Sequence, residues 1–73
     1  MAEQSNEIKK LTALAADVDM PGSLRTKAIE QIGNIGTHEA LLALLGLAAM
    51  EKLSRNDREL TLKMARQIIR SGG

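Results

Sequence analysis

Two acidic residues in the first third of the chain are the first candidates for chemistry. Asp17 and Asp19 stand at the first and third positions of a segment whose sixth residue is Gly22, which is the spacing of a calcium-binding loop. The fifth position is Pro21, which has no side-chain oxygen, and the twelfth is Ala28, where such a loop needs a bidentate carboxylate. The segment is therefore predicted to be a turn that ends a helix rather than a metal site.

His38 is the single histidine of the chain, and imidazole serves both as a metal ligand and as a general base. No cysteine is present to share a metal ion with it. Nucleophilic catalysis would need a serine beside this histidine and an orienting acid, but the serines suit helix caps or a terminal segment: Ser5, Ser23, Ser54 and Ser71. We predict that the protein is not an enzyme, that it has no catalytic, metal-binding or cofactor-binding residues, and that His38 faces solvent.

Two motifs have nucleic acid as an alternative ligand. Gly33-Asn34-Ile35-Gly36 matches a Gly-x-x-Gly loop that clamps RNA, but that loop belongs to a fold with a β-sheet, and this chain favours no strand. We predict a turn between helices there. Basic residues near the C-terminus can form a stripe along one helix, which attracts phosphates or acidic protein surfaces: Arg58, Lys63, Arg66 and Arg70. The alternative is a solvated face with an internal Glu59–Lys63 pair.

Composition limits what can position these residues. The chain has 73 residues and no cysteine or aromatic side chain, so one small domain with an aliphatic core is expected. Residues 1–49 are mildly acidic and residues 50–73 mildly basic. Neither the polar N-terminus nor the apolar run over residues 40–50 suits a signal peptide or a membrane span. We expect a cytoplasmic protein without membrane attachment.

The apolar periodicity predicts four helices. The first begins after Ser5 or Asn6 and ends before Pro21; the second starts near Pro21–Ser23 and ends at about Ile35. Thr37 caps the third, from His38 to about Leu53, and a capping box of Asn56 and Glu59 starts the fourth. The predicted inward residues are Ile8, Leu11, Leu14, Ala15, Val18, Leu24, Ala28, Ile29, Ile32, Ile35, Leu60 or Thr61, Leu62, Ala65, Ile68 and Ile69. The third helix is apolar all round and is expected to be buried on most sides.

A shift of thirty-three residues lays the chain on itself without a gap. Residues 11–16 then fall on residues 44–49, Arg25 falls on Arg58, and Ile29 falls on Leu62. The match predicts two helical hairpins of similar length, one after the other.

Residues 25–45 run Arg-x-x-Ala-Ile-x-x-Ile-Gly-x-Ile-Gly-Thr-His-Glu-Ala-Leu-Leu-x-Leu-Leu, and this resembles the HEAT-like repeat of the phycobilisome-lyase type. The resemblance covers residues 21–50, and the second unit departs from it at residues 67–70, as a terminal repeat can. It implies an all-α fold of two stacked antiparallel hairpins, as a HEAT-like α-solenoid unit or a compact four-helix bundle. Residues 6–36 and 37–70 would be the repeats of one domain, with flexible ends at residues 1–5 and 71–73.

Such repeats generally serve as scaffolds, so the resemblance implies a non-enzymatic protein–protein interaction module, an adaptor or a regulator. Its partner would be another protein, self-association included, because two repeats are fewer than solenoids usually need. The predicted partner-binding residues are Lys27, Gln31, Arg58, Lys63, Arg66 and Arg70. Nucleic-acid binding through the basic C-terminal helix is one alternative, against which the net charge of only +1 counts. A small bilin-lyase or chaperone-like subunit is the other.

Overall fold

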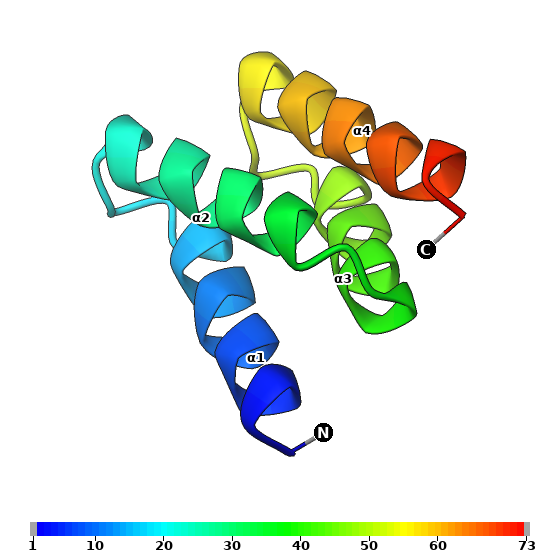
Figure 1. The fold of residues 1–73 in the computed structure, drawn as a ribbon. Coiled ribbons are helices and arrows are strands. Elements are labelled where there is room, and N and C mark those ends of the chain that lie inside the picture. Colours follow the sequence, from blue (N-terminus) through cyan, green and yellow to red (C-terminus); the bar gives the residue numbers. More distant parts are fainter. Residues whose placement is uncertain (1, 73) are drawn as a thin grey trace.

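The computed structural model describes residues 2–72, with side chains from residue 6 onward. They form four α-helices, α1 (Ala2–Ala16), α2 (Gly22–Ile35), α3 (His38–Ala48) and α4 (Arg55–Arg70), and the described residues contain no strand (Figure 1). The predicted all-α fold is confirmed. Met1 and Gly73 lie outside the described residues.

Two predicted helix ends are wrong. Helix α1 begins at Ala2 rather than after Ser5 or Asn6, so residues 2–5, which the sequence analysis places in a flexible N-terminus, are helical. Helix α3 ends at Ala48 rather than near Leu53, because the chain turns there and the backbone N–H of Met50 donates to the carbonyl of Leu47. The turn folds the Leu53 side chain back into the core, and this burial favours the turn over a longer helix.

The N-terminal cap of α3 is the predicted residue, whereas the N-terminal cap of α4 is not. Thr37 caps α3 as predicted, with its hydroxyl accepting a hydrogen bond of 3.1 Å from the backbone N–H of Ala40. At α4 the cap is Ser54, whose hydroxyl accepts from the backbone N–H of Asp57 at 3.2 Å. The predicted capping box of Asn56 and Glu59 is therefore wrong by two residues, since both residues already lie within the helix.

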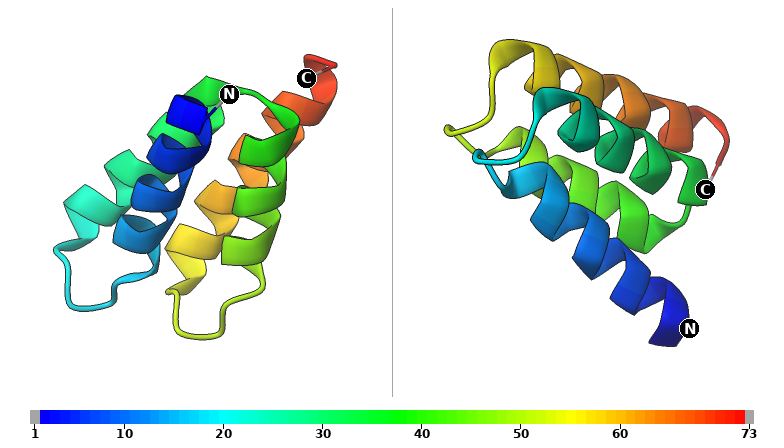
Figure 2. Two further views of the ribbon diagram at one scale, coloured as in Figure 1. Left: turned by 90° about the horizontal axis from the view of Figure 1, so that it is seen from below. Right: turned by 90° about the vertical axis from the view of Figure 1, so that its left-hand side faces the viewer.

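The helices pair as two antiparallel hairpins, α1 with α2 and α3 with α4, which stack side by side (Figure 2). Helix α1 packs on α3 and α2 packs on α4, so each layer holds one helix from each hairpin. Among the described residues, α1 and α4 make no contact, although they would be neighbours in a closed up-and-down bundle. The hairpins therefore form an open stack with two uncovered ends.

The thirty-three-residue repeat is visible in the helix boundaries, because α2 begins at Gly22 and α4 begins at Arg55. Between the hairpins, α2 ends at Ile35 and is capped by Gly36, whose φ of 68° is the left-handed conformation that glycine adopts without strain. The turn predicted over residues 33–36 is confirmed at Gly36 only, because residues 33–35 belong to α2. Gly36 and Thr37 alone connect α2 to α3, which holds the two hairpins close together.

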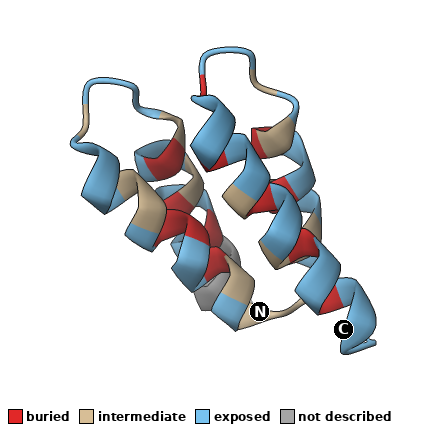
Figure 3. Cartoon of the chain, turned by 90° about the horizontal axis from the view of Figure 1, so that it is seen from above, coloured by how far each residue is buried: buried red, intermediate tan, exposed pale blue. Residues whose placement is uncertain are grey.

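The core lies between the hairpins (Figure 3). Of the predicted inward residues, the following are buried: Ile8, Leu11, Ala15, Ala28, Ile29, Ile32, Thr61, Ala65 and Ile68. Five others are exposed: Leu14, Val18, Leu24, Leu62 and Ile69. Helix α3 is also less buried than expected, since Leu42 and Leu45 face solvent. The periodicity identified apolar stripes correctly, but part of each stripe lies outside the interface between the hairpins.

Gly33 lies within α2 in tight contact with α4, and it does not break the helix. A β-carbon built on Gly33 would lie 2.8 Å from Sδ of Met64 and 3.0 Å from its Cβ. The Met64 sulfur can rotate away from such a contact, but its Cβ is fixed to the backbone of α4. Any larger residue at position 33 must therefore push the two helices apart.

Gly33→Ala is expected to lower the free energy of unfolding by about 1–2 kcal/mol, because overpacking outweighs the better helix propensity of alanine. Gly46→Ala is the matched control, since Gly46 also lies inside a helix and its added β-carbon would meet nothing within 4 Å. That control should gain up to about 1 kcal/mol. Urea denaturation followed by far-UV circular dichroism measures both, and equal stabilisation by the two changes would contradict the close helix contact.

Candidate functional site

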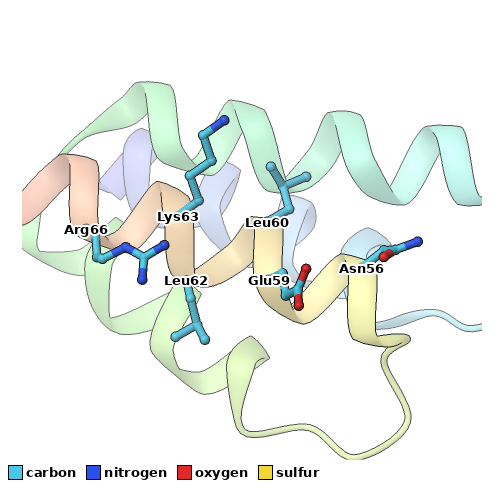
Figure 4. Close-up of a pocket in the computed structure, with 6 residues that line it drawn as sticks. All are labelled: Asn56, Glu59, Leu60, Leu62, Lys63 and Arg66. Carbon is cyan, nitrogen blue, oxygen red and sulfur yellow. The ribbon is translucent and has the colours of Figure 1, made fainter.

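Residues that are thirty-three positions apart occupy equivalent places in the two hairpins, but some of these pairs differ strongly in solvent exposure. The exposed member of each such pair lies at an end of the stack. Ile29 on α2 is 0% exposed, because the second hairpin covers it, whereas its counterpart Leu62 on α4 is 43% exposed. In Figure 4, Leu60 and Lys63 point toward α2, while Leu62 points to the opposite side of α4. Leu62 therefore lies on the side of the second hairpin that faces away from the first.

We call this side the C-terminal end face. We assign to it two exposed leucines of α3, one turn apart, and four residues of α4 spaced three or four apart: Leu42, Leu45, Arg58, Leu62, Arg66 and Ile69. All six are exposed. Large apolar side chains next to arginines are typical of surfaces that bind proteins.

The opposite end of the stack is the N-terminal end face, formed by α1 and α2. Leu14 and Leu24 are exposed there, whereas their counterparts Leu47 and Asp57 are buried under the first hairpin. A shallow hollow of about 200 Å³ lies between the helices, lined by Leu11, Leu14, Leu24, Lys27, Ala28 and Gln31. Two of the predicted partner-binding residues, Lys27 and Gln31, are therefore on this face.

The structure does not bring the six predicted partner-binding residues onto one surface. Lys63, Arg66 and Arg70 lie together, since with Gln67 they line a hollow of about 260 Å³ on α4. Lys63 and Arg66 also line a larger hollow, of about 530 Å³, with Asn56, Glu59, Leu60 and Leu62 (Figure 4). Arg58 lines none of these hollows, and Lys27 with Gln31 belongs to the other end of the stack.

The alternative interpretation of the basic stripe, an internal Glu59–Lys63 pair, differs from the structure. Glu59 pairs with Arg55, with 3.6 Å between Nε and the carboxylate oxygen, and both side chains are largely exposed. The ammonium group of Lys63 therefore stays available on the surface of α4, beside Arg66.

Sequence analysis missed an ion pair between the hairpins. Nη1 of Arg25 on α2 lies 3.6 Å from Oδ2 of Asp57 on α4, with side-chain exposures of only 17% and 9%. Nε of Arg25 and Oδ2 of Asp57 are both buried without a hydrogen-bond partner, so electrostatic attraction alone compensates them. The sequence does contain a signal for this ion pair. Asp57 lies four residues before the buried Thr61, so an acidic residue stands on the inward side of α4.

The remaining candidates from the sequence are the histidine, a metal site and a membrane span. His38 is exposed in the first turn of α3, as predicted. No three His, Asp or Glu side chains among the described residues come close enough together to hold a metal ion. No helix in residues 2–72 has both the length and the apolarity needed to cross a membrane.

Comparison with known proteins adds no relative. No protein-family model, curated protein or solved structure matches the chain. The resemblance to a HEAT-like repeat therefore stays a prediction from residues 21–50, and the function must be argued from the two end faces and the basic surface of α4.

Proposed function

We propose that the protein is a non-enzymatic, HEAT-like interaction module, an adaptor or regulatory scaffold that binds another protein in the cytoplasm through its helix faces. One observation carries the proposal. Leu62 is 43% exposed on the C-terminal end face, although Ile29 at the equivalent position of the first hairpin is fully covered by a neighbouring hairpin. The side of the first hairpin that carries Ile29 is thus covered by the second hairpin, whereas the equivalent side of the second hairpin, which carries Leu62, is open.

Covering the open surface would be favourable. Burial of apolar area contributes roughly 25 cal/mol per Å², and the second hairpin exposes Leu42, Leu45, Leu62 and Ile69. Stacked helical repeats usually need three or more units for stability, and this chain supplies two. A protein partner that packs against an end face would supply the missing neighbour.

The proposal is tested by affinity capture from a lysate of the source cell, run with and without nuclease and eluted in salt steps. We expect wild-type bait to retain one discrete protein. Bait carrying Arg55→Ala is the matched control, because Arg55 is exposed on α4 and, among the described residues, forms an ion pair with Glu59 alone, so this bait should retain the same protein. Capture of nothing but nuclease-sensitive nucleic acid would refute the proposal.

Nucleic-acid binding is a second candidate, favoured by the cluster of Lys63, Arg66 and Arg70 around one hollow of α4. Three phosphate contacts to single-stranded nucleic acid would give a plot of log affinity against log salt a slope of roughly −2. Arg66→Ala/Arg70→Ala would reduce that slope to between about −0.5 and −1. Fluorescence polarisation of a labelled oligonucleotide measures it, and binding that does not respond to this double change would exclude α4 as the site.

A further inference from the structure

We propose that the C-terminal end face binds a helical hairpin of a partner protein whose second helix carries two acidic residues seven positions apart. This inference rests on the proposed function and specifies the partner's chemistry. The model for the complex is the chain's own interface, in which the second hairpin packs on the first. The thirty-three-residue repeat gives each α2 residue of that interface a counterpart on α4, from which we infer what a third hairpin would meet.

The first acid follows from the ion pair between the hairpins. In the internal interface Arg25 is largely covered and pairs with Asp57 of the next hairpin. Its counterpart on the C-terminal end face is Arg58, which is exposed and has no acidic partner among the described residues. A hairpin that covered this face in the same way would place a residue equivalent to Asp57 over Arg58. Only an acidic residue there compensates the arginine charge once water is displaced.

The second acid follows from the close contact of α2 with α4. Gly33 leaves room for Met64 in the internal interface, but the counterpart of Gly33 on the end face is Arg66. A methionine opposite Arg66 would be overpacked and would leave a guanidinium without a partner. A carboxylate at that position would pair with the guanidinium. Because Arg66 and the acidic residue both carry a β-carbon, the partner's helix would lie farther from α4 than α4 lies from α2. Met64 follows Asp57 by seven residues, or two helical turns, so both acids lie on one side of the partner's helix.

A second copy of this chain does not meet these requirements. Its N-terminal end face would present Leu24 at the position of Asp57 and Gln31 at the position of Met64. Arg58 would then be covered by a leucine, and Arg66 would face an amide rather than a carboxylate. The C-terminal end face therefore favours an acidic hairpin from another protein over continued stacking of identical copies.

A probe with the proposed chemistry can be made from the chain itself. Leu24→Asp and Gln31→Glu install the two acids on its N-terminal end face, and Leu62→Asp disables its own C-terminal end face. All three positions are exposed, and position 24 is the third residue of α2, as Asp57 is of α4. Circular dichroism melts confirm that the probe folds; if it does not, the probe with Leu24→Asp and Leu62→Asp replaces it. A chain with Leu62→Asp alone is the matched control.

Sedimentation velocity of wild type mixed with the probe should reveal a one-to-one complex. We expect binding at least about tenfold weaker for the control chain, and for wild type carrying Arg58→Ala, because each loses the charge pair. No complex with the folded probe, or equal affinity after Arg58→Ala, would overturn the inference. Self-association of wild type that Leu62→Asp abolishes would assign the face to a second copy and overturn it too.

The failure of this inference can be distinguished from the failure of the proposed function. If lysate capture retains a discrete protein equally well with wild-type bait and with bait carrying Arg58→Ala/Leu62→Asp, the protein is an interaction module that uses another surface. Loss of the captured protein with that double variant, together with binding of the acidic probe, supports both.

Discussion

Replacing Ile29 with alanine should lower the free energy of unfolding by about 3–4 kcal/mol, as expected for a large aliphatic side chain deleted from a packed core. Ile29 is 0% exposed and lies in the interface between the hairpins. The cavity cannot close easily, because α2 already touches α4 at Gly33 and Met64. Urea denaturation followed by far-UV circular dichroism measures the loss, since the chain has no tryptophan or tyrosine to report by fluorescence.

Leu62→Ala is the control for Ile29→Ala, because the two residues occupy the same position in the repeat. Leu62 is half-exposed, so its truncation should cost less than about 1 kcal/mol. A similar loss of stability for both variants would mean that the two hairpins are equally covered, which would contradict the open stack.

Asp57→Ala should cost about 2–3 kcal/mol, because it leaves the guanidinium of Arg25 buried without a counter-charge. The estimate is below that for fully buried pairs, since the Arg25 side chain keeps 17% of its exposure. Chemical denaturation of the single variants and of Arg25→Ala/Asp57→Ala gives the coupling energy of the pair by a double-mutant cycle.

The surface pair Arg55–Glu59 is a matched control for that measurement. Its charged atoms are also 3.6 Å apart, but the side chains are 88% and 66% exposed. Glu59→Ala should therefore change stability by no more than about 0.5 kcal/mol. Replacing the buried pair by Arg25→Met and Asp57→Leu should restore most of the stability that Asp57→Ala removes. A cost for Asp57→Ala as small as that for Glu59→Ala would show that burial does not strengthen the pair.

The helices and the repeat could be predicted because their signals are local. Apolar spacing located four helices, Thr37 identified the start of α3, and Gly36 the end of α2. The predicted end of α3 is wrong because residues 49–53 are all good helix formers, and only the burial of Leu53 in the turn decides against a longer helix. Burial depends on packing, which local patterns do not contain.

The candidate site could be predicted only in part, for the same reason. Exposed basic residues such as Lys63 and Arg70 were correctly placed on the surface. The apolar pattern of the fourth helix predicts that Leu62 is buried. Leu62 and Ile29 are equivalent in the repeat, and only the stacking order of the hairpins makes one a core residue and the other a surface residue. The pairing of Arg25 with Asp57 depends on the same order.

The two-residue connection at Gly36 and Thr37 has a consequence for how the protein can be lengthened. The stack has different surfaces at its two ends, and each is built from one hairpin alone. A thirty-three-residue unit inserted at this connection would extend the molecule from its middle, leaving both end faces as they are. Such a unit would need Asp57 and Met64 equivalents on one side and Arg25 and Gly33 equivalents on the other. Insertion of such a unit would thus change the distance between two recognition surfaces without altering either.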